Sequence, residues 1–299
     1  MVLPIVEGPL QGVLLGVTAA VCWGYGDFSA KRLVDHTGSL RGVALVQGLG
    51  LLPLLILLVL WPTPAPSLLL LGGLVLVGLL GCAANILFFR SFEVGPLSLV
   101  SPISSAYVAI TVGLALLVLG ELPGPLQLAG ILLTAGGTIV AALASDRTSR
   151  GGTVSQRAPS TTKGVAAALG AAVGFGLMFF LLKPLAESTG PVLPVTFVRV
   201  ASFCVVAPLI VRSPRSAPSS STFPWGLLVI AVTLDSIAFL AYTTGVRLNL
   251  LSVVAPVTGA FGGFTALFAY WLLGERLGRL QWAGILALLL GILILSTAP

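Results

Sequence analysis

The segment LSLVSPISSAYVAITVGLALLVLGELPGPLQLAGIL (97–132) occurs a second time, in diverged form, as LSVVAPVTGAFGGFTALFAYWLLGERLGRLQWAGIL (251–286). The two copies align without a gap at a shift of 154 positions, from 97 to 251, and both contain a proline, the tripeptide LGE and the ending AGIL. The first apolar segments of the two halves also match, at a shift of 152, which pairs Lys31 with Lys183. Chance identity does not keep such features at a constant shift, so the chain consists of two related halves.

The composition places the chain in a lipid bilayer. Of its 299 residues, 57% are hydrophobic and only 8% are charged, and the mean hydropathy is +1.11. A soluble domain has about 25% charged residues to cover its surface. The net charge of +6 is spread over connecting segments, whereas a nucleic-acid-binding face needs a concentrated basic patch, so we expect no nucleic-acid partner. The three cysteines lie far apart within apolar runs and show no metal-ligand spacing, and we expect no cofactor.

Ten apolar segments are long enough to cross about 30 Å of hydrocarbon. Charged residues, prolines and glycines delimit them near 10–30, 41–61, 68–89, 97–119, 125–144, 164–182, 194–211, 225–245, 251–273 and 280–297. The long polar stretch SDRTSRGGTVSQRAPSTTK (145–163) is typical of a flexible linker. We therefore predict an all-α integral membrane protein with ten transmembrane helices, organised as a five-helix repeat over 1–145, a linker over 146–163 and a second five-helix repeat over 164–299.

Five crossings per repeat have a geometric consequence. The second copy enters the membrane in the opposite orientation to the first, which makes the chain an inverted-topology repeat. Transporters with such repeats place the solute path between the two halves near the midplane and move the solute by alternating access. The expected function is therefore a secondary transporter of a small-molecule solute and not an enzyme, and the sequence carries no ATP-binding motif.

The basic residues predict the orientation in the plasma membrane. Twelve of the fifteen lie on the side of the membrane that carries the linker, and the other three, Lys183, Arg199 and Arg247, lie on or near the side of the two termini. The positive-inside rule therefore predicts a cytoplasmic linker and both termini outside.

The doubled pattern resembles a known family. A proline, LGE and AGIL follow one another in each half, at Pro102, 119–121 and 129–132 and again at Pro256, 273–275 and 283–286, and this pattern is similar to that of the EamA-like permeases of the drug/metabolite transporter superfamily. The resemblance covers nearly the whole chain. It implies a ten-helix basket with a central cavity and the export or exchange of small metabolites, amino acids or drugs. Members of the family commonly keep both termini in the cytoplasm, and the charge distribution of this chain predicts the reverse.

Polar positions differ between the two halves. Arg199 matches a basic residue that is often present in the second helix of the family's repeats, whereas its counterpart in the first half is Gln47. The counterpart of Asp235 is Gly81, with Asn85 one turn further along. Arg199 and Asn85 are therefore candidate substrate-binding residues in a site that we expect to be asymmetric.

Asp235 is the only charged residue in its apolar segment (225–245). An aspartate at a helix centre costs roughly 2.5–3.5 kcal/mol on insertion scales, so either a function or a hydrogen bond to a neighbouring helix has to offset this cost. On a helix, Asp235, Phe239 and Tyr242 share one face. An acid beside two aromatic rings suits a cationic or zwitterionic solute, or a carboxyl group that takes up and releases a coupled proton.

Trp23, Asp27 and Lys31 share one face of the first segment. Asp27, with Trp23, is either a second solute-binding group or half of an Asp27–Lys31 pair that holds the helix end, an interaction of only a few tenths of a kcal/mol. The second half keeps only the lysine of this set, Lys183, and we assign both lysines a gating or structural role.

Hydroxylated and aromatic residues follow the proline of each half's repeated pattern. Ser104 and Tyr107 follow Pro102, and Phe261 follows Pro256, so these three residues are candidates for lining the solute path. A proline near the start of a segment frees a backbone carbonyl and permits a kink, which suits either a moving helix or a fixed bend.

Glu121 and Glu275 each end a segment beside a turn, at equivalent places in the two halves. Because the repeats are inverted, the two glutamates lie on opposite sides of the membrane. This arrangement favours a structural or gating role over substrate binding.

Two other classes of protein remain as alternatives. GYGD (24–27) matches GxGD, a short signature of intramembrane aspartyl proteases, and Asp235 could supply the second acid of a catalytic pair. The match is short, the chain is rich in glycine, and the second half has no GxGD. A passive channel is the other alternative. Solute flux, its saturation and the cleavage of a helical peptide distinguish the three classes.

Overall fold

The computed structural model describes residues 9–95, 97–149, 161–212, 223–273 and 277–297, and every regular element in these ranges is an α-helix. Helices are expected here because a backbone in lipid has to satisfy its hydrogen bonds internally. In chain order they are α1 (Pro9–Thr37), α2 (Ser39–Leu49), α3 (Leu51–Leu60), α4 (Leu68–Val94), α5 (Leu97–Ser104), α6 (Tyr107–Val118), α7 (Pro125–Ser149), α8 (Thr161–Thr189), α9 (Val192–Arg212), α10 (Trp225–Leu248), α11 (Leu251–Gly259), α12 (Phe261–Leu273) and α13 (Arg279–Thr297).

Helices occupy all ten of the predicted segments, and three segments contain two consecutive helices each: α2–α3, α5–α6 and α11–α12. Within the described residues, seven helical stretches are long and apolar enough to cross a membrane, with α2 and α3 together forming one of them. The helices over 107–118, 125–141 and 251–265 are apolar but shorter. The all-α membrane class is confirmed, and the number of ten crossings stays a prediction.

Two helix breaks occur at equivalent positions of the two halves. The backbone N–H groups of Ala106 and Ala260, 154 positions apart, donate to the carbonyl three residues earlier, at 3.1 and 3.2 Å. Such bonds are tighter than those of an α-helix and mark a local change of direction. The breaks separate α5 from α6 and α11 from α12, and they place Tyr107 and Phe261 at the starts of the second helices.

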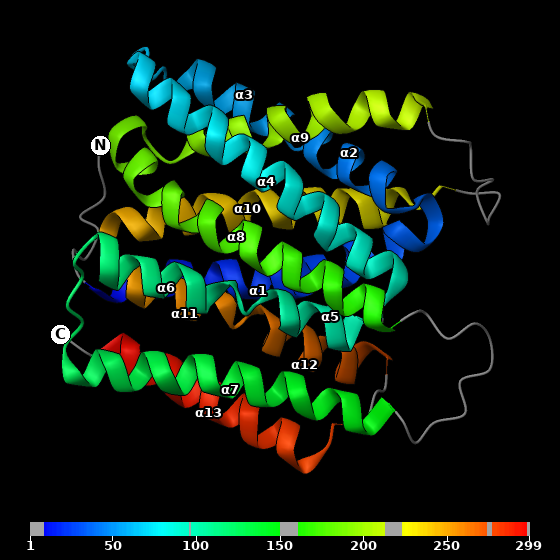
Figure 1. Ribbon diagram of the computed structural model, residues 1–299, viewed down its shortest axis with the longest axis vertical. Coiled ribbons are helices and arrows are strands. Elements are labelled where there is room, and N and C mark those ends of the chain that lie inside the picture. Colours follow the sequence, from blue (N-terminus) through cyan, green and yellow to red (C-terminus); the bar gives the residue numbers. More distant parts are fainter. Residues whose placement is uncertain (1–8, 96, 150–160, 213–222, 274–276, 298–299) are drawn as a thin grey trace.

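The two halves interleave rather than forming separate bodies. Helix α1 of the first half packs against α10, α11 and α12 of the second, and α4 packs against α8 and α9. The last helices of the halves, α7 and α13, lie side by side along one edge of the bundle (Figure 1). Helix α1 begins and α13 ends at one end of the bundle, here named the terminal end; α7 ends and α8 begins at the opposite end, the linker end (Figure 1). One buried apolar core runs through both halves.

Glycines allow the close approach of α7 and α13. A Cβ atom at Gly137 would lie 2.5 Å from the backbone nitrogen of Leu288 and 2.6 Å from the carbonyl oxygen of Gly284. Gly130 and Gly291 face each other in the same way. A Cβ atom at Gly130 would lie 3.2 Å from the carbonyl oxygen of Gly291, and one at Gly291 would lie 2.9 Å from that of Gly130. Small residues at such crossings let helix backbones pack closely in a membrane.

Replacement of Gly137 by alanine is expected to destabilise the protein. Its methyl group meets backbone atoms, which cannot rotate away, so the two helices have to separate at a cost of about 1–3 kcal/mol. The neighbouring Gly136 has no atom within 4 Å of its ideal Cβ, so Gly136→Ala is the matched control and should be neutral or slightly stabilising through its better helix propensity. Thermal unfolding in detergent measures both. Equal midpoints for the two variants would contradict the proposed packing.

Candidate functional site

A cavity lies between the two halves of the bundle. About 590 Å³ of space not filled by atoms lies between its lining residues, and this figure includes space open to the outside. Helices α1, α4, α8 and α10 provide most of the wall, and α2, α6 and α12 contribute one residue each. The lining residues of α1 and α4, at 23–30 and 85–89, belong to the second half of each helix. Since α1 runs from the terminal end towards the linker end, the cavity lies mainly on the linker side of the bundle centre.

Seven of the ten predicted substrate-binding residues line this cavity: Trp23, Asp27, Asn85, Tyr107, Asp235, Phe239 and Phe261. The other three lie away from its wall. The Ser104 hydroxyl donates to the carbonyl of Val100 at 2.9 Å within α5, and the Tyr242 hydroxyl donates to the carbonyl of Phe179 at 3.0 Å. Arg199 is fully buried behind Asp235.

Further lining residues were not identified from the sequence. They include four phenylalanines, at positions 88, 89, 175 and 179, and the small residues Gly26, Ala30, Val46 and Ala231. Phe175 and Phe179 correspond to Trp23 and Asp27 at the shift of 152, so a comparison of the two halves position by position would have identified them. No such signal marks Phe88 and Phe89, because an apolar residue of a membrane helix can equally face lipid, protein or a cavity.

The repeat explains which residues meet at the cavity. Counterparts from the two halves line it together: Trp23 with Phe175, Asp27 with Phe179, Asn85 with Phe239, and Tyr107 with Phe261. The rings of the last pair stack with centroids 6.3 Å apart and planes inclined by 14°. All four pairs thus combine a polar or amphipathic residue of the first half with a phenylalanine of the second. The cavity therefore lies between the repeats, and its polar groups are distributed asymmetrically.

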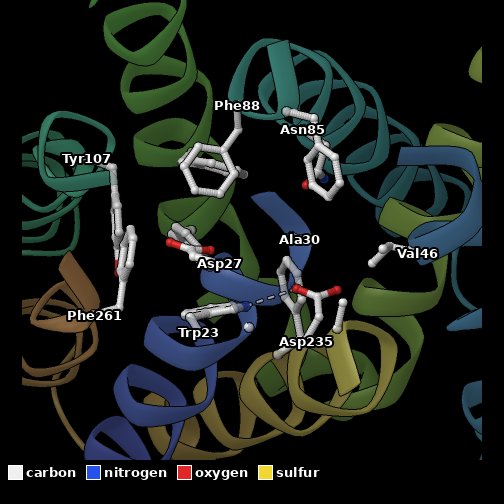
Figure 2. A pocket seen from close by; sticks show the side chains of 15 residues that line it. Trp23, Asp27, Ala30, Val46, Asn85, Phe88, Tyr107, Asp235 and Phe261 are labelled. Carbon is white, nitrogen blue, oxygen red and sulfur yellow. Dashed lines mark hydrogen bonds between the residues drawn. The ribbon is translucent and has the colours of Figure 1, made fainter. Parts of the chain in front are cut away.

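Two hydrogen bonds hold the carboxylate of Asp235. Its Oδ1 accepts a hydrogen bond from Trp23 Nε1 at 3.0 Å, drawn in Figure 2, and its Oδ2 accepts one from Arg199 Nη2 at 2.9 Å. The side chain of Asp235 is 19% exposed and that of Arg199 is 0% exposed. A charge-assisted pair of this geometry is stronger than a neutral hydrogen bond. Asp235 thus faces the cavity with its charge balanced from behind.

Arg199 has further partners on two helices, α2 and α10. Its Nη2 also donates to Ser236 Oγ at 3.0 Å, and its Nη1 donates to the Val46 carbonyl at 3.2 Å and to Gln47 Oε1 at 3.3 Å. Gln47 is the counterpart of Arg199 in the first half, so these two positions meet across the repeats. A Cβ atom at Gly50 would lie 2.1 Å from Nη1, which explains why the residue that faces the guanidinium has no side chain.

Asp27 is the more buried of the two cavity carboxylates. It is 5% exposed, and its Oδ2 accepts a hydrogen bond from Ser101 Oγ at 2.8 Å. Within the described ranges no cationic side chain forms an ion pair with Asp27. Lys31 pairs with Asp35 instead, so the alternative of an Asp27–Lys31 pair is wrong.

Aromatic rings close the cavity towards the terminal end. The ring centroid of Phe179 lies 4.6 Å from those of Tyr107 and Tyr242 and 5.4 Å from that of Trp23. Trp23 and Phe239 meet edge to face at 5.1 Å. The Tyr107 hydroxyl is buried and has no hydrogen-bond partner among the described residues. This hydroxyl is therefore a buried polar group of the wall whose hydrogen bond is not satisfied by the described residues.

Glu121 joins the two repeats beyond this aromatic layer. Its Oε1 and Oε2 accept hydrogen bonds from the backbone N–H groups of Leu251 and Ser252, each at 2.8 Å, at the start of α11. Lys183 Nζ lies 4.0 Å from Glu121 Oε1 and donates to the carbonyls of Val246 and Asn249 at 2.8 and 3.2 Å. A carboxylate at a helix N-terminus is favoured by the orphan N–H groups and the helix dipole. We name this set the Glu121 contact.

The other predicted gating or structural residues lie as follows. Pro102 belongs to α5, and Pro256 is buried within α11. Lys31 and Lys183 make equivalent i,i+4 pairs, with Asp35 and Glu187 respectively. Glu275 lies outside the described residues.

An all-α bundle of two sequence-related halves, with a largely apolar cavity between them that contains two carboxylates, has the architecture of a membrane transporter. The sequence matches the EamA-like transporter family over residues 10–143 and 162–297. The chain therefore belongs to this family, within the drug/metabolite transporter superfamily, as the resemblance indicated.

Structural comparison agrees with this fold. A solved crystal structure of another protein is 16% identical in sequence and matches with a TM-score of 0.75, over 96% of this chain and 98% of the other. No curated protein matches the sequence. The family makes the chain a multi-pass membrane protein that acts on a small-molecule solute.

Proposed function

We propose that the protein is a secondary transporter that exports a small organic solute across the plasma membrane by alternating access. The observation that carries the proposal is the cavity between the interleaved repeats, in which Asp235 is held by Trp23 and Arg199. Intramembrane ionisable residues in such positions are functional as a rule. The cavity wall comes from both halves, so a relative movement of the halves alters access to the bound solute.

Two features support alternating access. The cavity lies towards the linker end, whereas the aromatic layer and the Glu121 contact lie between the cavity and the terminal end. In the proposed cycle this is the state closed towards the terminal end and open towards the linker end. With the linker in the cytoplasm, as the basic residues predict, the open side is cytoplasmic, which is the loading state of an exporter.

A proton is the coupling ion that we propose. The cavity contains a carboxylate, Asp27, that forms no ion pair with a described residue, and such a group can carry a proton from one side to the other as access alternates. An imposed pH gradient across proteoliposomes should therefore drive solute accumulation, and equal flux with and without the gradient would leave facilitated exchange as the mode.

Replacement of Asp235 by asparagine is expected to reduce transport at least ten-fold while the protein still inserts and purifies. The substitution keeps the shape of the side chain but leaves Arg199 without its anion beside the solute. A loss of about 1.4 kcal/mol in the binding of the solute lowers its affinity ten-fold. Proteoliposome uptake of a labelled amino acid, a nucleoside and an arylalkylamine measures this. The matched control is Asp35→Asn, because Asp35 is an exposed residue of α1 outside the cavity.

The same vesicles distinguish the alternatives. Saturable flux of one solute class, lost in Asp235→Asn and kept in Asp35→Asn, supports the transporter. Flux that rises linearly with solute concentration indicates a channel. Cleavage of a helical peptide without flux indicates the protease; against that class, Asp235 pairs with Arg199 and not with a second acid that shares a proton.

A further inference from the structure

We infer that the solute is an organic cation with a flat apolar body, and that Asp27 is the residue that binds its charge. The inference rests on the proposed function, since it names the class of solute for the same cavity. It follows from the charge balance of the cavity, the burial of Asp27 and the rings that surround it.

The charge balance leaves one carboxylate free to attract a cation. Asp27 and Asp235 are the acidic residues of the lining, and no basic residue lines the cavity as described. Asp235 is neutralised by the fully buried Arg199, at 2.9 Å. Asp27 has only neutral partners: it accepts from Ser101, whose hydroxyl also lies 3.4 Å from Thr265 Oγ1. The cavity therefore carries a net charge of one negative unit when Asp27 is ionised.

Burial makes this charge a binding determinant. Asp27 is only 5% exposed, and an ionised carboxylate in such surroundings is unfavourable unless a partner compensates it. A solute that brings a positive charge supplies that partner. An anionic solute would add to the uncompensated charge, and it would be excluded.

The rings around Asp27 suit the body of such a solute. Figure 2 shows Asp27 at the centre of the cavity, with Phe88 on one side and Trp23 on the other. Phe175 and Phe179 complete the surroundings, with ring centroids 5.5 Å from Phe88 and 5.4 Å from Trp23, respectively. Faces of aromatic rings attract cations and stack on flat apolar groups.

A zwitterionic amino acid fits this cavity less well than a cation. Its carboxylate needs a cationic or strongly donating partner, and Arg199 is 0% exposed and already bound to Asp235, Ser236, Val46 and Gln47. Trp23 Nε1 is committed to Asp235 as well. The described lining thus offers an anionic partner for the ammonium group and no cationic partner for the carboxylate.

Four probes with the same indole body test the inference: tryptamine (cation), tryptophol (neutral), tryptophan (zwitterion) and indole-3-acetate (anion). Equilibrium binding of each labelled probe to the purified full-length protein in detergent is measured first, because binding does not depend on transport. Tryptamine is expected to bind at least ten-fold more tightly than each of the other three.

Three variants connect this preference with Asp27. Asp27→Asn should remove the preference for tryptamine over tryptophol, whereas Asp27→Glu, which keeps the charge, should retain it in part. Asp35→Asn, on the same helix but outside the cavity, should match the unaltered protein. Gel filtration in detergent excludes variants that fail to fold, and Asp27→Glu keeps the test decisive if Asp27→Asn is among them.

The outcomes separate the inference from the proposed function. Tight tryptamine binding that needs a carboxylate at position 27, without tryptamine flux in proteoliposomes, supports the cation site and contradicts the transporter. Flux of tryptophan with no effect of Asp27→Asn supports the transporter and overturns the cation site. Equal binding of all four probes, or binding of none, also overturns it.

Discussion

Replacement of Arg199 by methionine is expected to destabilise the protein strongly. Methionine preserves much of the length of the side chain but removes a charge that is completely buried. Asp235, which faces the cavity, then lacks its cation, and removal of one partner of a buried pair costs about 3–5 kcal/mol. The acceptors of Val46, Gln47 and Ser236 lose their donor at the same time.

Thermal unfolding in detergent measures this effect. A loss of 3–5 kcal/mol corresponds to a fall in the midpoint of roughly 10 °C for a protein of this size class. Arg212→Met is the matched control, since Arg212 is an exposed residue at the end of the same helix, α9, and should change the midpoint little.

The double variant Arg199→Met/Asp235→Asn separates charge from packing. It leaves no unpaired charge, so it should recover part of the lost stability, with a coupling between the two sites that a double-mutant cycle quantifies. If the double variant were as unstable as the sum of the single variants, the ion pair would not be the source of the effect.

Replacement of Glu121 by glutamine is expected to open the terminal end of the bundle more often. Glutamine offers one acceptor oxygen where Glu121 offers two, and its amide nitrogen is a donor that faces the N–H group of Leu251 or Ser252. One buried N–H then lacks an acceptor, at a cost of about 1–3 kcal/mol to the closed arrangement. Each 1.4 kcal/mol changes the ratio of closed to open states about ten-fold.

The rate at which a cysteine is labelled measures this opening. Val246→Cys introduces a thiol at a buried position whose backbone carbonyl accepts from Lys183. Cys22, Cys82 and Cys204 are first replaced by serine, and a membrane-impermeant thiol reagent is added on the side of the termini. In this background Glu121→Gln should raise the labelling rate about ten-fold.

Glu187→Gln is the control for the Glu121 experiment. Glu187 also pairs with Lys183, at 3.0 Å, but it is exposed and contacts no backbone N–H of α11. Exposed pairs contribute little, so its labelling rate should change less than two-fold. Equal rates for Glu121→Gln and the unaltered protein would show that the Glu121 contact does not hold this end closed.

The candidate site could be predicted in part. Asp235 and Asp27 were found because an acid within an apolar segment is conspicuous, and their aromatic neighbours on the same helix face followed from helical spacing. Tyr242 shares that face with Asp235 but points its hydroxyl at the Phe179 carbonyl, because a helix face is wide enough to contact two different neighbours. Phe88 and Phe89 were missed because apolarity alone does not say what a residue faces.

Sequence by itself determined the membrane class, the doubled organisation, the positions of the helices and the family. These properties depend on composition, on the spacing of residues close together in the chain and on a comparison of one half with the other. The structure alone decided which partners the charged residues have. Arg199 binds Asp235 across 36 positions and Gln47 across 152, and Glu121 reaches the start of α11 across 130. Such contacts depend on how helices cross and how far side chains extend, and no pattern local to the chain records either quantity.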